Sequence, residues 1–555
     1  MSVDVSAAAK PEGASMRTVV AASSAGTAFE WYDFFVFGTL SAVIGKNFFA
    51  QLDDTAGVLA ALALFGAGFF FRPIGALIFG GMGDRVGRKA AFLITVTLMG
   101  GATFAIGLLP TYEQVGPLAP ILLIICRIIQ GTALGGEYGG AAIYVAEHAP
   151  ADKRGQYTGW IQTSAAFGLL GALLVIYVTR TTVGETAFTG GGWTAGWRIP
   201  FLFSAGLLAV SIYMRLKLVE SPSFQKLKDS GEQSKHPYQE SFLKWANLKI
   251  VLMVLIALMS AQGAAWYTAF FYAQVFMERF LKIAPTTANL LIMCMTVASA
   301  PLYVFFAWLS DKVGRKWVMW FGMTLYLVAY FPGFHALTAL GNPALAEAQA
   351  RTPVMVVADP AACALQFDII GKAKFLSSCD IAKSALSNAG VSYENQAAPA
   401  GSMAEVRIGS TVVASREGTG LSAADLKAAK ADVDTRIKAA LAAAGYPAKA
   451  DPARVNFMGL FGILMIFVVA ATALYGPMAS ALVELFPTRI RYTALSLPYH
   501  VGTGWIGGFV PVTAFAIVTA TGNIYAGLWY PFVFTAISVV ACFFLLPETR
   551  GRPID

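Results

Sequence analysis

The residues of this sequence that could do chemistry are charges inside long apolar stretches. There are five of them: Glu30, Asp33, Arg72, Arg127 and Glu137. If such a stretch crosses a membrane, a charge near its centre costs at least ~2.5 kcal/mol, so it must face a cavity or another charge. Three acids and two arginines allow near-neutral pairing, for example of Glu30 or Asp33 with Arg72. One acid is then left free to take up and release a proton.

Two roles suit these charges. We predict that Asp33, with Glu30, is the site of proton coupling, because an acid near Arg72 can change partner when it titrates. We predict that Arg127 binds an anionic group, since a guanidinium is a planar, permanently charged fork that matches a carboxylate. Glycines follow Arg127 at 131, 135 and 136, and we expect them to leave room for a ligand. The alternative is a permanent ion pair of Arg127 with Asp33 or Glu30.

Polar and aromatic residues of the second half complete the predicted binding set. The positions 227 residues after Glu30, Asp33 and Arg72 are uncharged, so the second half would supply neutral contacts. The predicted substrate-binding residues are Arg127, Arg72, Gln262, Tyr267 and Tyr272, with His500 as a further candidate. Each of the uncharged residues could instead be an ordinary residue of a helix interface.

Composition indicates the elements that must position these residues. The 555 residues are 57% hydrophobic and only 13% charged. Apolar runs of ~20 residues, long enough to cross ~30 Å of hydrocarbon as helices, recur along the chain. We predict an all-α polytopic membrane protein with twelve spans, near 19–44, 57–81, 90–110, 118–147, 156–179, 196–217, 249–277, 288–308, 317–340, 455–485, 494–520 and 525–547. The net charge of +8 comes from loop cations, so it does not indicate a nucleic-acid partner.

A charged turn occurs twice and divides the chain into two halves. GGMGDRVGRK at 80–89 returns as AWLSDKVGRK at 307–316, with Asp84 and Asp311 227 residues apart. A repeated turn between membrane helices is typical of transporters built from two homologous halves. We predict a bistable charge network that opens and closes one end of the protein. Its members would be Asp84, Arg85, Arg88, Glu137, Glu147, Arg154, Asp311, Arg315, Glu484 and Arg491.

A second repeat locates an insertion. Glu147 to Arg154 matches Glu484 to Arg491 at an offset of 337, about 110 residues more than the first repeat. The only long stretch that does not resemble a membrane segment, 341–452, accounts for the difference. Its pattern predicts a small α/β domain with strands near 353–359 and 406–415 and helices near 380–388 and 421–445. We predict a disulfide between Cys363 and Cys379, with two free thiols as the alternative.

These boundaries give five segments and an orientation. We predict a first six-helix bundle at 1–217, a linker at 218–248, helices seven to nine at 249–340, the insert at 341–452 and helices ten to twelve at 453–555. Lysines and arginines number 21 in the short segments on one side and 5 on the other. This bias predicts that both termini are cytoplasmic and that the insert is extracytoplasmic.

The motifs resemble those of the major facilitator superfamily. The paired charged turns are similar to that superfamily's loop between its second and third helices. Three stretches, EWYDFFVFG (30–38), FRPIGALIFGGMGDRVGRK (71–89) and RIIQGTALGGEYGGAAIYVAEHAP (127–150), resemble its metabolite:proton symporter branch, whose members carry proline, betaine, 2-oxoglutarate, citrate or shikimate. The resemblance implies two six-helix bundles and proton-coupled symport of a carboxylate or zwitterionic osmolyte by alternating access. It also implies a monomer in the bacterial inner membrane that is not an enzyme and needs neither cofactor nor metal.

Two alternatives stay open. The segment from Glu147 to Arg154 and the terminal PETRG at 547–551 also resemble motifs of sugar carriers, which favours a sugar porter-like symporter. A membrane receptor that senses a ligand through its insert is the second alternative, and the intramembrane charges argue against it. ATP-driven transport is disfavoured because no GxxxxGK[ST] motif occurs.

Overall fold

The computed structural model describes residues 16–49, 54–217, 219–364 and 375–554. Within these residues, ten helices are long and apolar enough to cross a membrane. Two further helices of 24 and 32 residues, α1 (Met16–Thr39) and α3 (Asp54–Arg85), carry the intramembrane charges Glu30, Asp33 and Arg72. The predicted class, an all-helical polytopic membrane protein with a small α/β insert, is confirmed.

The first half packs as a bundle in which α3 lies against α6 and α1 against α7. Its remaining elements are α2 (Ser41–Phe48), α4 (Arg88–Leu108), α5 (Tyr112–Val115), α6 (Leu118–His148), α7 (Arg154–Val183), α8 (Glu185–Phe188) and α9 (Arg198–Leu216). Glycines let α3 and α6 approach to backbone contact. A Cβ on Gly131 would lie 2.3 Å from the oxygen of Gly68, and one on Gly135 would lie 2.2 Å from the oxygen of Arg72. The glycines of α6 therefore pack helices, and the predicted role of leaving room for a ligand is wrong.

The second half forms the other bundle. Its first helical run, Trp245–Phe280, is interrupted by three π-helical turns: it consists of α12 (Trp245–Val254), η1 (Leu255–Met259), α13 (Ser260–Tyr267), η2 (Thr268–Tyr272), α14 (Ala273–Val275) and η3 (Phe276–Phe280). The others are α15 (Pro285–Val313), α16 (Arg315–Gly341), α20 (Phe457–Tyr475), α21 (Met478–Leu485), η5 (Thr488–Ile490), α22 (Arg491–His500), η6 (Val501–Gly507), α23 (Val510–Thr521), η7 (Ala526–Leu528) and α24 (Trp529–Leu545). Such π-turns often occur at functional sites.

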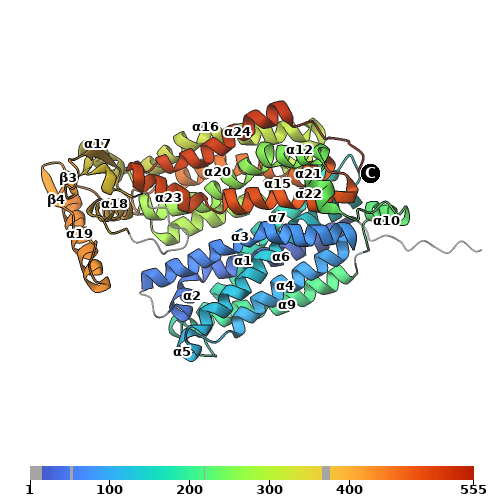
Figure 1. Ribbon diagram of the computed structural model, residues 1–555, viewed down its shortest axis with the longest axis horizontal. Helices are drawn as coiled ribbons and strands as arrows, with labels where there is room; N and C mark the ends of the chain where they lie inside the picture. Colours follow the sequence, from blue (N-terminus) through green and yellow to red (C-terminus); the bar gives the residue numbers. More distant parts are fainter. Residues whose placement is uncertain (1–15, 50–53, 218, 365–374, 555) are drawn as a thin grey trace, which may run out of the picture.

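The two bundles meet along a long interface (Figure 1). Helix α22 of the second bundle packs on α3 and α6 of the first, and α15 of the second packs on α7 of the first. The segment between the bundles forms two short helices, α10 (Pro222–Asp229) and α11 (Pro237–Phe242). Arg489 donates to Glu240 of α11 over 2.9 Å and ties this segment to the second bundle. The exact domain boundaries stay a prediction of the sequence.

The insert contains a four-stranded sheet in the order β2-β1-β3-β4. Its elements are α17 (Pro343–Arg351), β1 (Val354–Ala358), η4 (Pro360–Ala362), α18 (Ser378–Ala389), β2 (Tyr393–Ala397), β3 (Glu405–Ile408), β4 (Thr411–Ala414) and α19 (Ala423–Ala443). Strands β1 and β2 are parallel and joined through α18, while β3 pairs antiparallel with β1 and β4. Cys363 and Cys379 are bonded, with their Cα atoms 5.3 Å apart.

The single strand expected at 406–415 is a hairpin instead. Gly409 adopts a φ of +57° and reverses the chain, so that Ile408 pairs with Thr411. Helix α17 and strand β2 were not predicted, because the alternating apolar pattern is absent from the exposed, polar β2. In Figure 1 the insert lies at one end of the bundles, and the C-terminus and α10 lie at the other. We call these ends the insert face and the turn face, the latter after the repeated turns at 84–89 and 311–316.

Candidate functional site

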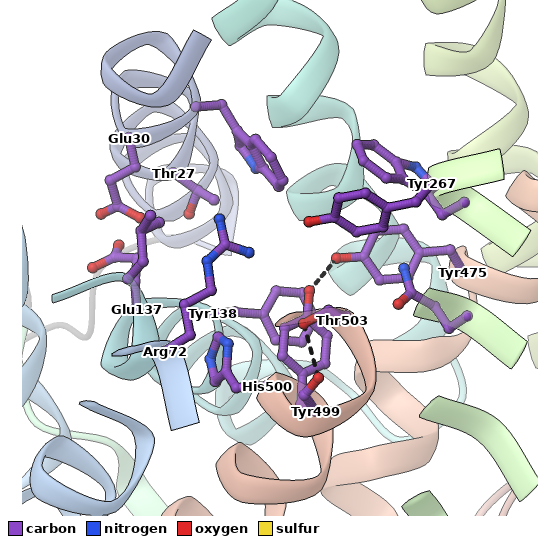
Figure 2. Close-up of a pocket in the computed structure, with 14 residues that line it drawn as sticks. Thr27, Glu30, Arg72, Glu137, Tyr138, Tyr267, Tyr475, Tyr499, His500 and Thr503 are labelled. Carbon is purple, nitrogen blue, oxygen red and sulfur yellow. Dashed lines mark hydrogen bonds between the residues drawn. The ribbon is translucent and has the colours of Figure 1, made fainter. Parts of the chain in front are cut away.

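A small cavity lies between the bundles, about 40 Å³ in volume, which is room for a few water molecules. Both halves of the chain line it, as Figure 2 shows. The lining residues are Thr27, Glu30 and Trp31 of α1, Arg72 of α3, Leu134, Glu137 and Tyr138 of α6, Gln262, Trp266 and Tyr267 of α13, Tyr475 of α20, Tyr499 and His500 of α22, and Thr503 of η6. The predicted residues Glu30, Arg72, Gln262 and Tyr267 meet here, together with the additional candidate His500.

Arg72 is the charge that stands alone in this cavity. Its guanidinium lies 4.3 Å from the ring of Phe69 and 5.2 Å from that of Phe34, and Tyr267 lies beside it. Among the residues that the structure describes, Nε and Nη2 of Arg72 have no hydrogen-bond partner, and no carboxylate forms an ion pair with Arg72. The predicted pairing of Arg72 with Glu30 or Asp33 is therefore wrong. Figure 2 shows the guanidinium reaching into the space between the glutamates and the tyrosines.

Glu30 pairs with an arginine near the end of a helix, a residue that the sequence did not single out. Arg215 of α9 is buried, and its Nη2 lies 3.2 Å from Glu30 and 2.5 Å from Glu137. The Arg215 guanidinium also covers the ring of Phe92 at 3.5 Å. Arg215 sits one residue before the end of its helix, a position typical of an exposed flanking charge. Nothing in the local pattern indicates that its side chain turns back into the bundle.

Glu137 belongs to the cavity wall rather than to the charge network at the turn face. Its Oε2 accepts a hydrogen bond from Thr95 over 2.9 Å, and its Oε1 shares Nη2 of Arg215 with Oε1 of Glu30. Two carboxylates on a single guanidinium leave one negative charge in excess, which a proton on either acid would balance.

Asp33 and Arg127 lie outside the cavity lining and are linked through two neutral side chains. Arg127 donates to Gln130 over 2.8 Å, and Gln130 donates to the Thr103 hydroxyl over 2.7 Å. Thr103 lies beside the Asp33 side chain, and its hydroxyl donates to the oxygen of Met99 over 3.0 Å. Arg127 also covers the Phe37 ring at 3.9 Å. Predicted for the substrate site, Arg127 is placed by the structure in the core of the first bundle.

Tyr272 is also absent from the cavity. It lies in η2, packed near Phe334 and Gly527, and its hydroxyl has no hydrogen-bond partner among the described residues. Tyr267 and Tyr272 are five residues apart, whereas residues three or four apart share a helix face. The two tyrosines therefore face different surroundings, and the prediction that Tyr272 joins the binding site is wrong.

Three tyrosines that the sequence did not single out join the bundles beside the cavity. Tyr138 of the first bundle stacks on Tyr499 of the second with ring centroids 3.9 Å apart. The Tyr499 hydroxyl hydrogen-bonds to that of Tyr475 over 2.5 Å, and Gln162 donates to Tyr138 over 2.8 Å. A tyrosine within an apolar helix carries no signal of its own, so only the fold reveals this stack.

The predicted charge network assembles at the turn face. Arg154 pairs with Glu484 at 2.8 Å and Arg491 with Glu147 at 2.6 Å, so both ion pairs join one bundle to the other. Within each turn, Arg88 pairs with Asp84 at 2.6 Å and Arg315 with Asp311 at 2.5 Å. These eight residues are buried. Together with the tyrosine stack, they bring the bundles into contact at this end.

Arg85 differs from the rest of the predicted network. It is exposed and lies over the ring of Tyr238 at 5.4 Å, and it forms no ion pair with any residue that the structure describes. Glu147 is paired as expected, while Glu137 lies at the cavity as described above. The sequence predicts the charged positions of the turns well, because each charge belongs to a repeated motif.

Comparison with known proteins identifies the family. The model of the family described as "Sugar (and other) transporter" matches residues 18–241 and 437–555. The shikimate transporter of Escherichia coli K12 is 37% identical over 332 residues, which cover 58% of this chain and 73% of that protein. The proline/betaine transporter of the same organism is 35% identical over 326 residues, covering 58% of this chain and 64% of that protein, so the match spans less than two thirds of that relative.

Two further similarities extend over the whole chain. A glycine betaine/proline/ectoine/pipecolic acid transporter, OusA of Dickeya dadantii, is 27% identical over 97% of this chain and 85% of that protein. The solved proton:xylose symporter XylE of the major facilitator superfamily superposes with a TM-score of 0.61 over 97% of both chains, at 17% identity. That likeness shows the fold alone. The chain belongs to the sugar (and other) transporter family, and it is a multi-pass membrane protein with a fold similar to that of XylE.

Proposed function

We propose that this protein is a proton-coupled symporter of a small metabolite that carries a carboxylate, and that it works by alternating access. The observation that carries the proposal is Arg72, a buried guanidinium in the cavity with two nitrogens that lack a partner. A buried charge without a counterion is costly, and a substrate carboxylate would supply both the charge and the acceptors.

Aromatic rings favour a zwitterion over a simple anion. Trp31, Trp266 and Tyr267 line the cavity together with Arg72, and the ring centroids of Trp31 and Trp266 are 6.0 Å apart. Ring faces attract ammonium groups, and the Glu30–Glu137 pair adds negative charge nearby. The relatives named for proline, betaine and ectoine fit this arrangement, whereas the carboxylate of shikimate would use the Arg72 contact alone.

Charge balance supports the coupling to protons. Between the turn face and Arg198 at the opposite end, the first bundle buries three carboxyl groups and three guanidinium groups, those of Glu30, Asp33, Glu137, Arg72, Arg127 and Arg215. Fully ionised, these six sum to zero. One proton on the Glu30–Glu137 pair leaves this set at +1, which a substrate carboxylate neutralises. Proton and carboxylate would therefore stabilise each other's binding, which is what symport requires.

We further propose that the turn face is cytoplasmic and that the chain lies in a bacterial inner membrane. The excess of Lys and Arg on this side and a relative named as an inner membrane transport protein support the orientation and the location. The ion pairs at the turn face would then hold the cytoplasmic gate closed and would break when the bundles rock.

Uptake into proteoliposomes tests the proposal. Purified protein with an inward-directed proton gradient is given radiolabelled proline, glycine betaine, shikimate, 2-oxoglutarate and xylose. We expect accumulation of at least one carboxylate, its loss when a protonophore is added, and no accumulation by Arg72→Ala. Accumulation of xylose alone, or uptake of a carboxylate that ignores the proton gradient, would contradict the proposal.

A further inference from the structure

The insert is fastened to the ends of two helical runs of the second bundle. One is the 245–280 run already described, and the other is Thr488–Thr521, which contains α22, η6 and α23. These two runs carry six of the cavity residues: Gln262, Trp266, Tyr267, Tyr499, His500 and Thr503. Contacts of the insert with the ends of these runs can therefore affect the positions of the cavity residues.

At the first attachment the insert caps the C-terminus of α23. A helix ends with carbonyl groups that lack partners within the helix. Asn395 donates to the oxygen of Thr521 over 2.8 Å, and Lys383 donates to that of Ala520 over 3.2 Å. The Tyr393 hydroxyl donates to Thr519, and its backbone N–H donates to Gly522 over 2.7 Å. Lys383 also places a positive charge at the negative end of the helix dipole.

The second attachment is made by the C-terminal end of α18, the helix that carries Lys383. Gly390 ends α18 with a φ of +72°, and a Cβ there would lie 2.5 Å from the oxygen of Phe280, the last residue of η3. Lys282 donates to the oxygen of Asn388, and Ala450 donates to the oxygen of Lys282 over 3.0 Å. Helix α18 thus packs on both η3 and α23.

The same two runs touch deeper in the bundle through glycines. A Cβ on Gly263 would lie 2.1 Å from the oxygen of Gly502, and one on Gly502 would lie 2.5 Å from that of Met259. Between this contact and the insert, the 245–280 run contains the π-turns η2 and η3, where the hydrogen-bond ladder is irregular and a helix can bend. The insert closes the far end of this otherwise deformable stretch.

We propose that the insert is a brace that joins the ends of the 245–280 and 488–521 runs, so that the second-bundle wall of the cavity moves as one unit. Lys383, Tyr393 and Asn395 are its positioning residues at α23, and Gly390 is its contact at η3. The consequence for transport rests on the proposed function, whereas the brace itself can be tested without any substrate.

Hydrogen–deuterium exchange of the full-length protein in nanodiscs tests the brace. The double variant Lys383→Met/Asn395→Ala removes two of the three side-chain donors to α23 and leaves the Tyr393 hydroxyl in place. The matched control, Lys430→Met/Gln396→Ala, alters exposed insert side chains that form no hydrogen bond or ion pair with the described residues of either helical run. If the brace exists, exchange should rise on the order of five-fold, the effect of losing about one hydrogen bond, both in peptides of 516–524 and in peptides of 274–284. The control should change neither window.

A second variant alters the contact of the insert with η3. Gly390→Ala places a methyl group against Phe280 at a left-handed backbone position, and it should raise exchange in the same two windows. The brace would be overturned if, in both variants, exchange rose in only one of the two windows. It would also be overturned if exchange rose only within the insert. Because no substrate is present, that result would leave the proposed symport untouched, and failure of symport would leave the exchange result standing.

Discussion

Asp84 and Asp311 make the same contact from opposite bundles. Asp84 accepts the backbone N–H groups of Tyr492 and Thr493 at 3.1 and 2.8 Å, in the first turn of α22. Asp311 accepts those of Gly155 and Gln156 at 2.9 and 2.7 Å, in the first turn of α7. A carboxylate at a helix N-terminus satisfies free N–H groups and complements the helix dipole. Each charged turn therefore caps a helix of the other half.

This relationship predicts the effect of Asp84→Asn. Asparagine keeps one acceptor but loses the charge that holds Arg88 and complements the dipole, so the closed turn face should be less stable. Because Asp84 does not line the cavity, we expect turnover to fall at least about ten-fold, equivalent to ~1.4 kcal/mol, with substrate affinity changed less than about two-fold. Initial uptake rates and equilibrium binding to the same purified protein measure the two quantities.

Asp152→Asn is the matched control, because Asp152 is exposed near the start of α7 at the same end of the protein. It should leave both quantities unchanged, and Asp311→Asn should behave like Asp84→Asn. An equal loss of affinity and rate in Asp84→Asn would show that Asp84 acts on the site or on folding instead.

A second prediction distinguishes the role of Arg72 from that of Arg127. Lysine keeps the charge but loses the two-point fork of a guanidinium. Arg72→Lys should therefore weaken binding of a carboxylate at least about ten-fold, because Arg72 faces the cavity with unpartnered nitrogens. Arg127→Lys should keep near-native affinity, since Arg127 contacts Gln130 and Phe37 away from the cavity lining.

Isothermal titration with the transported carboxylate measures both affinities, and thermal unfolding checks that both variants are folded. A large loss in Arg127→Lys with little change in Arg72→Lys would return the recognition role to Arg127, where the sequence placed it.

The sequence predicted motifs well and side-chain directions poorly. The repeated turns indicated two halves, the offset of 337 against 227 located the insert, and charged residues in the motifs met as partners. Arg215 was missed because a charge at a helix end usually points outward, and here it turns inward. Tyr272 was misplaced because it lies five residues after Tyr267, and only residues three or four apart share a helix face.

The buried triad makes a prediction about stability. Removing Arg215 leaves Glu30 and Glu137 buried without a cation, and breaking such a pair costs on the order of 3–5 kcal/mol. Arg215→Met should lower the midpoint of thermal unfolding markedly. Glu30→Gln in the same chain should restore part of the loss, because it removes one of the two carboxylates. Differential scanning calorimetry of the two variants and of Lys217→Met, an exposed neighbour in sequence, tests this. No rescue by Glu30→Gln would contradict a charge-based role.

The disulfide of the insert makes a separate prediction. Cys363 and Cys379 close a loop with a sequence separation of 16, and such a loop stabilises a fold by about 3 kcal/mol. Cys363→Ser/Cys379→Ser should expose the insert to limited proteolysis while the membrane helices stay protected. Cys126→Ser, which alters a free thiol within α6, is the control and should change nothing. Equal protease resistance of the double variant and the control would show that the bond contributes little.

The place of the coupling proton can be decided between two acids of α1 and their partners. If the Glu30–Glu137 pair holds the proton, Glu137→Gln imitates the protonated pair permanently, because an amide does not titrate and its oxygen can still accept from Thr95. Substrate should still bind and exchange down its gradient, while accumulation driven by protons is lost. Asp33→Asn tests the other site by the same logic, since Asp33 lies beside Thr103, which accepts from the Gln130 side chain that Arg127 contacts. We expect Glu137→Gln to abolish proton-driven accumulation and Asp33→Asn to lower it.

Counterflow in proteoliposomes without a proton gradient reports exchange, and uptake with the gradient reports accumulation. Normal accumulation by Glu137→Gln, with complete loss in Asp33→Asn, would assign the proton to Asp33 and leave the glutamate pair as a structural partner of Arg215.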